Sequence, residues 1–466
     1  MVATQPHVVW FKRDLRLRDH EPLVRAAEHG PVIAIYICEP HVVWDSPDHD
    51  DRHWGFIREC LADLHASLLD VGVPLTVRIG DAVNIFEQLR LDYNISHIWA
   101  HEETGNLATF ARDTAVMKWA KANRINFIEI PQSGVVRKCS SRTHWSKVRK
   151  ERLDRTPLPA PEHITPVHGV YSEPLPTAHN SLDRQRGGEQ LAHNIFDEFL
   201  SVRVNGYQRN ISSPLTAWDG CSRLSPYLAY GAISARDVIT TVRRKQTASD
   251  NDRSFSLRAF EDRMAWRDHF MQKLEDHPDM ELRSSFPQLD ELRMRVDEAK
   301  LEAWQQGHTG FPFVDACIRA LQHTGWINFR MRAMLVSFAA FDLWLPWQSF
   351  AHQLARWFVD YEPGIHWSQI HMQSGVTANP TLRIYNPVKQ SHDQDPDGVF
   401  IRQWVPELSY LDNNQMHEPW KHADLLSSNS SVYRNPIVHH EHALRLARER
   451  IEPVRQRLGI TRRSRP

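Results

Sequence analysis

The stretch His7-Val-Val-Trp-Phe-Lys-Arg-Asp-Leu-Arg-Leu-Arg18 decides how the first part of the chain folds. Its first five residues form a short apolar run with β-branched members, which is typical of a buried strand. The seven residues that follow are mostly charged, and no G-x-G-x-x-G motif is present there, so the standard dinucleotide fingerprint is missing. We expect this charged segment at the carboxyl end of a sheet, where ligands of open α/β sheets bind.

Strand and helix patterns alternate outward from this stretch. Short apolar runs predict further strands at Val32–Ile37, Leu75–Ile79, His97–Ala100 and Asn126–Ile130. Helical spacing between them predicts helices at Pro22–Glu28, Gly55–Asp70, Ala82–Leu89 and Thr109–Ala122. Strands separated by helices of this length predict an α/β domain built on a doubly wound parallel sheet.

The chain then changes character. Six prolines fall between Pro157 and Pro176, which indicates a long connector. From Leu191–Leu200 onward helical periodicity dominates, and β-type alternation is rare. The predicted organisation is an α/β domain at 1–131, a linker at 132–194 and a large all-α domain at 195–466.

Composition sets outer limits on function. The chain has 466 residues, 56 Lys and Arg against 57 Asp and Glu, and 41% hydrophobic residues. These values exclude a mostly disordered chain, a collagen-like chain and a polybasic one. The 16 Trp and 27 His are unusual, and so many indoles indicate either ring-shaped ligands or an aromatic core. The eight Arg after His442 predict a helix that ends in a solvated basic tail.

Cysteine and targeting patterns argue against several classes of site. The five Cys are scattered without metal-ligand spacing, so we expect no metal and no iron–sulfur cluster. The histidines of His439–His442 lack a completing partner, and Asp48–His53 is predicted to be a solvated loop. The start of the chain lacks a signal-peptide pattern, and the apolar stretch Met334–Trp347 is too short for a bilayer. We expect a cytoplasmic protein, a monomer, without a membrane segment.

Two segments of the helical part carry candidate chemistry. Gly220–Pro226 opens a helix, and Ser222 and Ser225 with the free N–H groups of its first turn can hold a phosphate or simply cap the helix. Arg330 and Arg332 follow a Gly-Trp pair and can bind phosphates or carboxylates, or form ordinary salt bridges.

In their order and spacing, the motifs of this chain resemble the photolyase/cryptochrome family. The matching segments are Val9–Asp19, Gly220–Pro226, Gly310–Asp315, Gly325-Trp326, Arg383–Pro387 and Phe400–Glu407. The resemblance extends from about residue 7 to residue 440. It implies an α/β antenna domain, a long linker and a helical domain that holds FAD.

The resemblance also implies the residues of an FAD site. They are Tyr207, Cys221, Ser222, Leu224, Ser225, Arg332, Asp360, Glu362 and His366. Arg332 and Asp360 match an ion pair beside the flavin ring that steadies charge on the reduced cofactor. Cys221 stands where most relatives have Thr, so a backbone donor is expected to replace one hydroxyl. Glu362 stands where relatives have Asp, near the ribityl or adenine region.

Three positions depart from the family pattern near the flavin. His366 stands where repair enzymes usually have an Asn that faces flavin N5, and it either faces N5 or points away. Ile370 replaces the innermost Trp of the family's electron route, Trp347 matches the middle one, and Met294 lies where the outermost would be. The usual route is therefore broken. Four further indoles either form another route or belong to the core, namely Trp326, Trp344, Trp357 and Trp367.

The substrate side departs as well. Trp266 and Arg267 match the lesion-facing pair, and with His366 and Trp347 they are the candidate catalytic residues. The candidate DNA-binding residues are Arg263, Trp266, Arg330, Met372, Arg383 and Gln390. Arg263 replaces a Glu of pyrimidine-dimer enzymes, and Met372 replaces a second stacking Trp. The histidines typical of (6-4) enzymes are absent, because the matching region has Asn328, Phe329 and Ala333.

The resemblance implies light-driven repair of UV-damaged DNA. Excited reduced FAD would pass an electron to a flipped cyclobutane pyrimidine dimer. Residues 360–390 resemble a prokaryotic branch associated with repair of single-stranded DNA. The alternative is a cryptochrome-type blue-light photoreceptor without repair activity, and a third possibility is a flavin-binding, DNA-associated protein with neither activity. An antenna chromophore of the pterin or deazaflavin type is a further expectation, with Glu102 and Glu103 at the end of a strand as its hydrogen-bond partners, although exposed acids there are equally ordinary.

Overall fold

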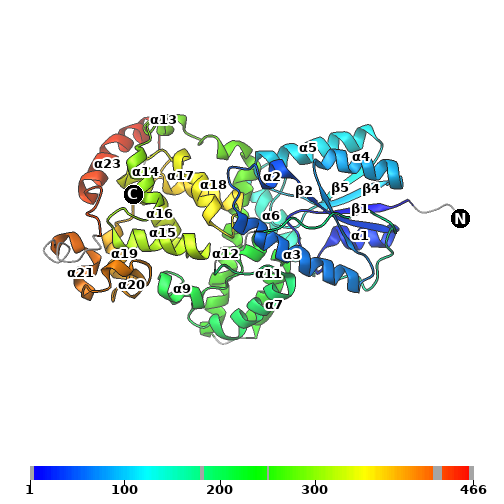
Figure 1. Ribbon diagram of the computed structural model, residues 1–466, viewed down its shortest axis with the longest axis horizontal. Helices are drawn as coiled ribbons and strands as arrows, with labels where there is room; N and C mark the ends of the chain where they lie inside the picture. Colours follow the sequence, from blue (N-terminus) through cyan, green and yellow to red (C-terminus); the bar gives the residue numbers. More distant parts are fainter. Residues whose placement is uncertain (1–4, 179–182, 249–250, 423–432, 461–466) are drawn as a thin grey trace.

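The computed structural model describes residues 5–178, 183–248, 251–422 and 433–460. Figure 1 shows a sheet flanked by helices at one end of the molecule and a large helical part at the other. None of the described helices combines the length and the apolar character needed to span a bilayer. The end of the predicted basic tail, residues 461–466, lies outside the described residues.

Five parallel strands form the sheet in the described part of the chain, in the order β3-β2-β1-β4-β5. The strands are β1 (His7–Phe11), β2 (Val32–Cys38), β3 (Leu75–Ile79), β4 (His97–His101) and β5 (Asn126–Ile130). The helices around them are α1 (Glu21–His29), α2 (Pro40–Val43), α3 (Asp51–Asp70), α4 (Ala82–Tyr93) and α5 (Leu107–Ala122). This arrangement confirms the predicted α/β fold class.

Strand β1 shows why the sheet is covered on both faces. All five of its residues are buried, as expected for a central parallel strand. Val8 and Trp10 point to one face, where Trp10 meets Phe86 of α4 edge to face. Val9 and Phe11 point to the other face and join a core that continues into the helical part. The two parts of the molecule therefore share one hydrophobic core.

The connector runs along the sheet before the helical part begins. It contains α6 (Arg142–Leu153), and its segment near Pro166 forms a parallel bridge with Val32 at the start of β2. Helix α7 begins at Glu189. The division of the chain into domains at 131 and 194 stays a prediction.

Helices make up the remainder of the described chain, which confirms the predicted large helical part. They are α7 (Glu189–Glu198), α8 (Tyr207–Asn210), α9 (Pro214–Gly220), α10 (Ser225–Ala229), α11 (Ala235–Thr247), α12 (Asn251–Asp276), α13 (Pro287–Asp290), α14 (Glu298–Gln305), α15 (Pro312–Thr324), α16 (Phe329–Ser337), α17 (Gln348–Trp357), α18 (Pro363–Gln373), α19 (Pro387–Gln394), α20 (Val399–Trp404), α21 (Asn413–His417) and α23 (His440–Arg457). π-helical turns at Phe199–Arg203 and Phe338–Asp342 extend α7 and α16.

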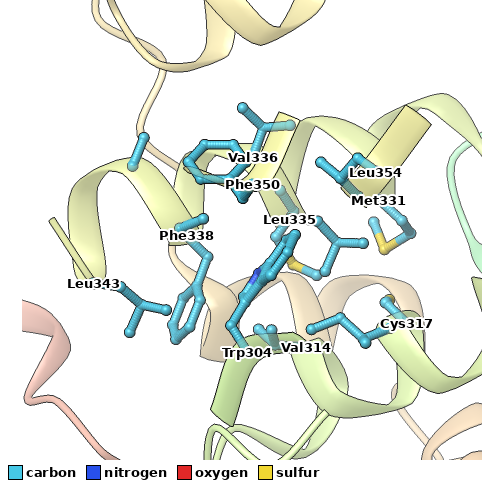
Figure 2. Close-up of a cluster of buried hydrophobic side chains, with 14 of the residues drawn as sticks. Trp304, Val314, Cys317, Met331, Leu335, Val336, Phe338, Leu343, Phe350 and Leu354 are labelled. Carbon is cyan, nitrogen blue, oxygen red and sulfur yellow. The ribbon is translucent and has the colours of Figure 1, made fainter. Parts of the chain in front are cut away.

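Much of the tryptophan surplus lies in the core of this helical part. Figure 2 shows Trp304 packed between Val314, Leu335 and Phe350. Trp304 also stacks on Trp357, with ring centroids 5.5 Å apart. These large side chains remove extensive apolar surface from water, which stabilises the helical scaffold around the cavity described below.

The prediction of a solvated loop at Asp48–His53 is wrong. Asp48 is only 3% exposed, and Arg52 and His53 are also buried. Their polar groups are satisfied by carbonyls and side chains of the helical part rather than by water. A charge-rich sequence is normally solvated, but here the helical part supplies a partner for each group.

Candidate functional site

A cavity of about 470 Å³ lies inside the helical part, between α8–α10, α12, α16 and α18. Most of the predicted site residues line it, although they come from segments far apart in the sequence. The lining includes Tyr207, Cys221, Ser222, Ser225, Arg263, Trp266, Arg267, Arg330, Arg332, Asp360, Glu362, His366 and Arg383. Four predicted residues are not part of this lining, namely Leu224, Trp347, Met372 and Gln390.

A bidentate ion pair forms one wall of the cavity. Arg332 on α16 donates from Nη1 and Nη2 to the two carboxylate oxygens of Asp360, at 3.0 and 2.8 Å. Its Nε donates to the carbonyl of Ile327, and its guanidinium lies over the ring of Phe358. A planar guanidinium held at three points cannot turn, so a fixed positive edge faces the cavity.

A second acid of the wall is held by two arginines. Glu362 lies 3.8 Å from Nη2 of Arg13, which belongs to the charged segment after β1, and 3.5 Å from Nη2 of Arg267 on α12. Burial raises the pKa of Glu362, and the two positive charges oppose that rise. The predicted lesion-facing Arg267 therefore points toward an acid inside the cavity. Its Nη2 also donates to the carbonyl of Leu228 at 3.0 Å.

The cavity concentrates buried polar atoms that have no hydrogen-bond partner among the described residues. They are Nη1 of Arg223 and Arg267, Oδ1 of Asn328, Nε of Arg330, Nε2 of Gln369 and Oε1 of Gln373. A buried unpaired polar group costs about 1–3 kcal/mol, so such groups are rare in native proteins. Their concentration in one cavity indicates a polar ligand that completes them.

Arg223 is the clearest residue that the sequence analysis missed. Its guanidinium is sandwiched between the rings of Trp218 and Trp326, 3.7 and 3.8 Å from their centroids. Burial lowers its pKa to about 9, and its Nη1 is unpaired. Stacking fixes the plane of the cation while one edge stays open, which suits a phosphate. The signal was present, because Arg223 lies inside the quoted segment Gly220–Pro226.

The neighbours of Arg223 are placed along the same edge. Ser225 accepts a hydrogen bond from Nε1 of Trp326 at 3.3 Å, and Ser222 accepts one from the backbone N–H of Leu224 at 3.4 Å. Leu224 itself is buried in the shared core. Burial raises the pKa of Cys221 to about 11, so its side chain is a neutral thiol and a weak donor.

His366 lines the cavity in a defined protonation state. Its Nε2 lies 3.0 Å from the carbonyl oxygen of Ala351, which only accepts, so Nε2 carries the proton. Burial lowers the pKa of His366 to about 4, and the ring is neutral at pH 7. The hydrogen bonds of the described residues include none to its Nδ1, which then has a lone pair. A neutral His366 can therefore offer a hydrogen-bond acceptor to a ligand of the cavity that it lines.

Exposed aromatic and basic side chains surround the mouth of the cavity. Trp266 on α12 is 47% exposed, and the guanidinium of Arg263 lies 4.4 Å from its ring centroid. Phe329 at the start of α16 is 42% exposed and also lines the cavity. The sequence analysis treated Phe329 only as the absence of a histidine, although an aromatic residue beside Arg330 was a signal for stacking.

The interruption of the family's electron route stays a prediction, and the structure shows where the residues concerned lie. Ile370 lines the cavity where an indole was missing, and Met294 is exposed on the surface. Trp347 is buried behind the cavity, donates from Nε1 to Asp290 at 2.8 Å, and lies 6.1 Å from Trp367 between ring centroids. The structure thus places Trp347 beside another indole, while its role stays a prediction.

A smaller cavity of about 120 Å³ lies at the carboxyl end of the sheet. Its charged side chains are paired with one another. Lys12 donates to Asp113 at 2.8 Å, while Arg112 donates to Glu103 at 2.6 Å and to Glu39 at 3.1 Å. Glu103, predicted as an antenna contact, is thus occupied by an arginine.

A buried group beside β1 has spacing that would suit a metal ion. Ligand atoms of Asp14, His20 and His101 lie within 4.8 Å of one another. However, Nδ1 of His20 accepts the backbone N–H of Leu23, so its Nε2 carries a proton and donates to Asp14 at 3.0 Å. Nδ1 of His101 lies 2.7 Å from the same carboxylate oxygen. These hydrogen bonds hold the charged segment after β1 in place.

Two family models match the chain. Residues 7–147 match the model described as DNA photolyase, and residues 260–453 match the FAD binding domain of DNA photolyase. A cryptochrome DASH of Gloeobacter violaceus is 28% identical over 90% of this chain and 89% of its own length. A deoxyribodipyrimidine photo-lyase of Alkalihalophilus pseudofirmus is 29% identical over 89% of this chain and 90% of its own length.

Solved structures agree in fold. A bacterial class III photolyase from Agrobacterium tumefaciens superposes with a TM-score of 0.87 at 25% identity, over 98% of this chain and 99% of its own. The match over both parts of the molecule indicates that the sheet, the connector and the helical cavity form one inherited unit.

Proposed function

Because the chain belongs to the photolyase/cryptochrome family, we propose that it binds FAD in the helical cavity and carries out light-driven repair of pyrimidine dimers in DNA. The observation that carries the proposal is the set of unpaired buried polar atoms around one cavity. Such atoms fit a ligand with phosphates, hydroxyls and a heteroaromatic ring, and FAD has all three. The matched FAD-binding model covers most of the residues concerned.

The residues present suit the different parts of FAD. Arg223, with one open edge, would hold a phosphate. Arg332, fixed by Asp360, would place positive charge beside the flavin ring and favour its reduced, anionic form. His366 would accept a hydrogen bond at Nδ1. When bound in its reduced form, FAD supplies the excited electron that splits the cyclobutane ring and that returns afterward, so no net redox change occurs.

DNA binding is supported by charge at the cavity. Six arginines line it against two acids, and both acids are already paired with arginines. Arg263, Arg330 and Arg383 would therefore contact DNA phosphates, although the whole chain has a net charge of −1. Trp266 would stack on the flipped dimer, and the lesion's weakened pairing lowers the cost of flipping.

The mouth of the cavity supports a preference for single-stranded DNA. Trp266 and Phe329 are both exposed there, and exposed aromatic rings beside cations are typical of proteins that stack on unpaired bases. Stacking on one base contributes about 1–3 kcal/mol. We expect Phe329→Ala to weaken binding of a single-stranded dimer oligonucleotide roughly ten-fold and binding of its duplex much less. An equal loss on both substrates would contradict the preference.

The experiment that tests the main proposal is repair under blue light. Purified protein reduced with dithionite is illuminated with a thymine-dimer oligonucleotide, single-stranded or duplex, and dimer loss is measured by chromatography. Dark samples and an undamaged oligonucleotide are the controls. We expect loss of dimers in light only. Unchanged dimers in both substrates would refute repair.

A blue-light photoreceptor is the second candidate function. It is favoured by one observation, the cation of Arg263 over Trp266 at the position where the family's dimer-repair enzymes have a Glu. The same experiment discriminates, because a photoreceptor would change its flavin spectrum in light and leave the dimers intact.

An antenna chromophore is a separate proposal, and the α/β cavity does not fit one in its present arrangement. A cavity of about 120 Å³ is smaller than one that holds benzene, whereas a deazaflavin has three fused rings. Arg112 would have to leave its carboxylates to admit it. We therefore expect added deazaflavin to produce no bound near-ultraviolet band, and a stoichiometric band after gel filtration would contradict this.

A further inference from the structure

One wall of the helical cavity is held by the α/β part of the molecule. The wall is the segment 357–362, which joins α17 to α18 and includes Asp360 and Glu362. Helix α3 begins at the boundary between the two parts (Figure 1), and Arg52 and His53 in its first turn reach this wall, as does Asp48 just before the helix. We propose that Asp48, in the segment before α3, is a positioning residue for the flavin-binding acids of the wall.

The backbone of the wall is bonded at three carbonyls by side chains of the α/β part. Arg52 donates to the carbonyl of Trp357 at 2.8 Å, and Nε2 of His53 lies 2.9 Å from that of Phe358. Arg13 donates to the carbonyl of Tyr361 at 2.7 Å. These bonds satisfy groups that would otherwise be buried and unpaired, so the wall depends on the neighbouring part for its path.

Asp48 fixes the side chain at the centre of the wall. Its two carboxylate oxygens accept from the hydroxyl of Tyr361 and from Nδ1 of His352, both at short distance. The ring of His53 stacks on that of Tyr361, with centroids 6.0 Å apart and an interplanar angle of 18°. Burial opposes ionisation of Asp48, but the hydrogen bonds from His352 and Tyr361 outweigh it and lower its pKa.

Tyr361 lies between the two acids of the wall, Asp360 and Glu362, so its position affects where their carboxylates lie. Asp360 holds Arg332, and Glu362 is held by Arg13 and Arg267, so both acids are engaged at the cavity. Tyr361 lies between them and is anchored by Asp48 from outside the helical part. Loss of that anchor lets the two acids shift, and Arg332 is then no longer held at the place where it meets the flavin. The inference rests on FAD binding in this cavity, and repair activity is not needed for it.

The experiment compares variants of Asp48 with a matched control. Asp48→Asn weakens the hydrogen bond from Tyr361, because it replaces a charged acceptor with a neutral one, while Tyr361→Phe removes that bond from the other side. Asp45→Asn changes an exposed acid of the same segment that pairs only with exposed His41, and it serves as the control. For each, the dissociation constant of FAD from the apoprotein, the flavin midpoint potential and the thermal unfolding midpoint are measured.

We expect Asp48→Asn and Tyr361→Phe each to weaken FAD binding about ten-fold and to lower the midpoint potential, because Arg332 stabilises the anionic reduced flavin less well. The double variant should lose little more than either single one, since both changes act on the one hydrogen bond between Asp48 and Tyr361. Asp45→Asn should match the wild type. If the Asp48 variants unfold at lower temperature but keep the wild-type dissociation constant and potential, Asp48 has only a structural role. Wild-type protein that takes up no FAD would instead overturn the proposed function.

Discussion

The cavity at the end of the sheet and the cavity of the helical part are both lined by charged side chains, yet they differ in how those charges are paired. In the cavity at the end of the sheet, Lys12 and Arg112 are paired with buried carboxylates, and only Nε2 of His49 is left unpaired. In the larger cavity of the helical part, six buried polar atoms have no hydrogen-bond partner among the described residues. The comparison teaches that unpaired polar groups, rather than charge, distinguish a ligand site from a structural ion network.

The difference has a physical origin in what each set of charges holds together. The charged segment after β1 connects the sheet to the helical part, and Arg13 and Arg16 donate to the carbonyls of Ala229 and Gly231 on the other side. The charged groups of this segment are therefore already hydrogen-bonded within the protein. In the helical cavity, Arg223 is fixed by stacking and Arg267 lies beside Glu362, while a buried nitrogen of each, and one of Arg330, has no hydrogen-bond partner among the described residues.

The largest expected effect concerns the cavity at the end of the sheet, called the paired cavity because its charged side chains are paired with one another. Arg112→Met removes a cation that contacts three carboxylates, those of Glu39, Glu103 and Asp113. Breaking a buried network by removing one partner leaves charge uncompensated, so we expect a loss of about 3–5 kcal/mol in the free energy of unfolding. Denaturant titration measures it. The FAD dissociation constant should be unchanged, and a comparable loss of FAD binding would break the distinction between the two cavities.

The next effect concerns the cavity of the helical part, where buried polar atoms lack hydrogen-bond partners among the described residues. Arg332→Leu leaves the buried carboxylate of Asp360 unpaired and removes the positive edge that faces the ligand. We expect FAD binding to weaken about 100-fold, which corresponds to roughly 2.7 kcal/mol. Fluorescence titration of the apoprotein measures it. Arg332→Lys is the matched control, because it keeps the charge and loses the bidentate geometry, and it should recover only part of the affinity.

The sequence predicted the scaffold better than the contacts across it. The runs His7–Phe11 and Asn126–Ile130 have the short apolar pattern of strands, so the buried central strand and the partly exposed edge strand were both predictable from local pattern. Asp48–His53 was misjudged, because its burial depends on carbonyls more than 300 residues further along the chain. Local pattern contains no information about such distant partners. The missed role of Arg223 has the same cause, since the two indoles that sandwich it come from helix α9 and from the loop between α15 and α16.

A smaller effect concerns histidines in both parts of the molecule. Burial lowers the pKa to about 4 at His53, His366 and His371, and to about 3 at His101. In the unfolded chain each titrates near 6.5, so between pH 6.5 and 4 the unfolded state binds more protons. Stability should therefore be full above pH 6.5 and fall on acidification, by up to about 1.4 kcal/mol per pH unit for each group.

Denaturant unfolding at pH 7.0, 6.0 and 5.0 checks this dependence. His371→Gln changes a histidine outside the lining of both cavities, and it should reduce the slope by about one proton while the FAD affinity stays as in the wild type. His366→Gln should reduce the slope by the same amount and also weaken FAD binding, because His366 lines the cavity proposed to hold FAD. If both variants have the same FAD dissociation constant, His366 does not contribute to FAD binding.

The smallest effect compares the two cavities directly, by adding a threonine hydroxyl, a hydrogen-bond donor, to each of them. Cys221→Thr replaces a neutral thiol, a weak donor, with a hydroxyl in the cavity that has unpaired edges. We expect FAD to bind about three- to five-fold more tightly, a gain below about 1 kcal/mol that is typical of one neutral hydrogen bond. Val43→Thr adds a hydroxyl to the paired cavity, where the charges are already satisfied by one another. It should leave FAD binding unchanged and lower the unfolding free energy slightly, because the new polar group is desolvated there. Weaker FAD binding by Cys221→Thr would mean that the thiol fits the ligand better than a hydroxyl does. The unpaired polar atoms of the cavity would then not mark a place where residue 221 can donate to the ligand.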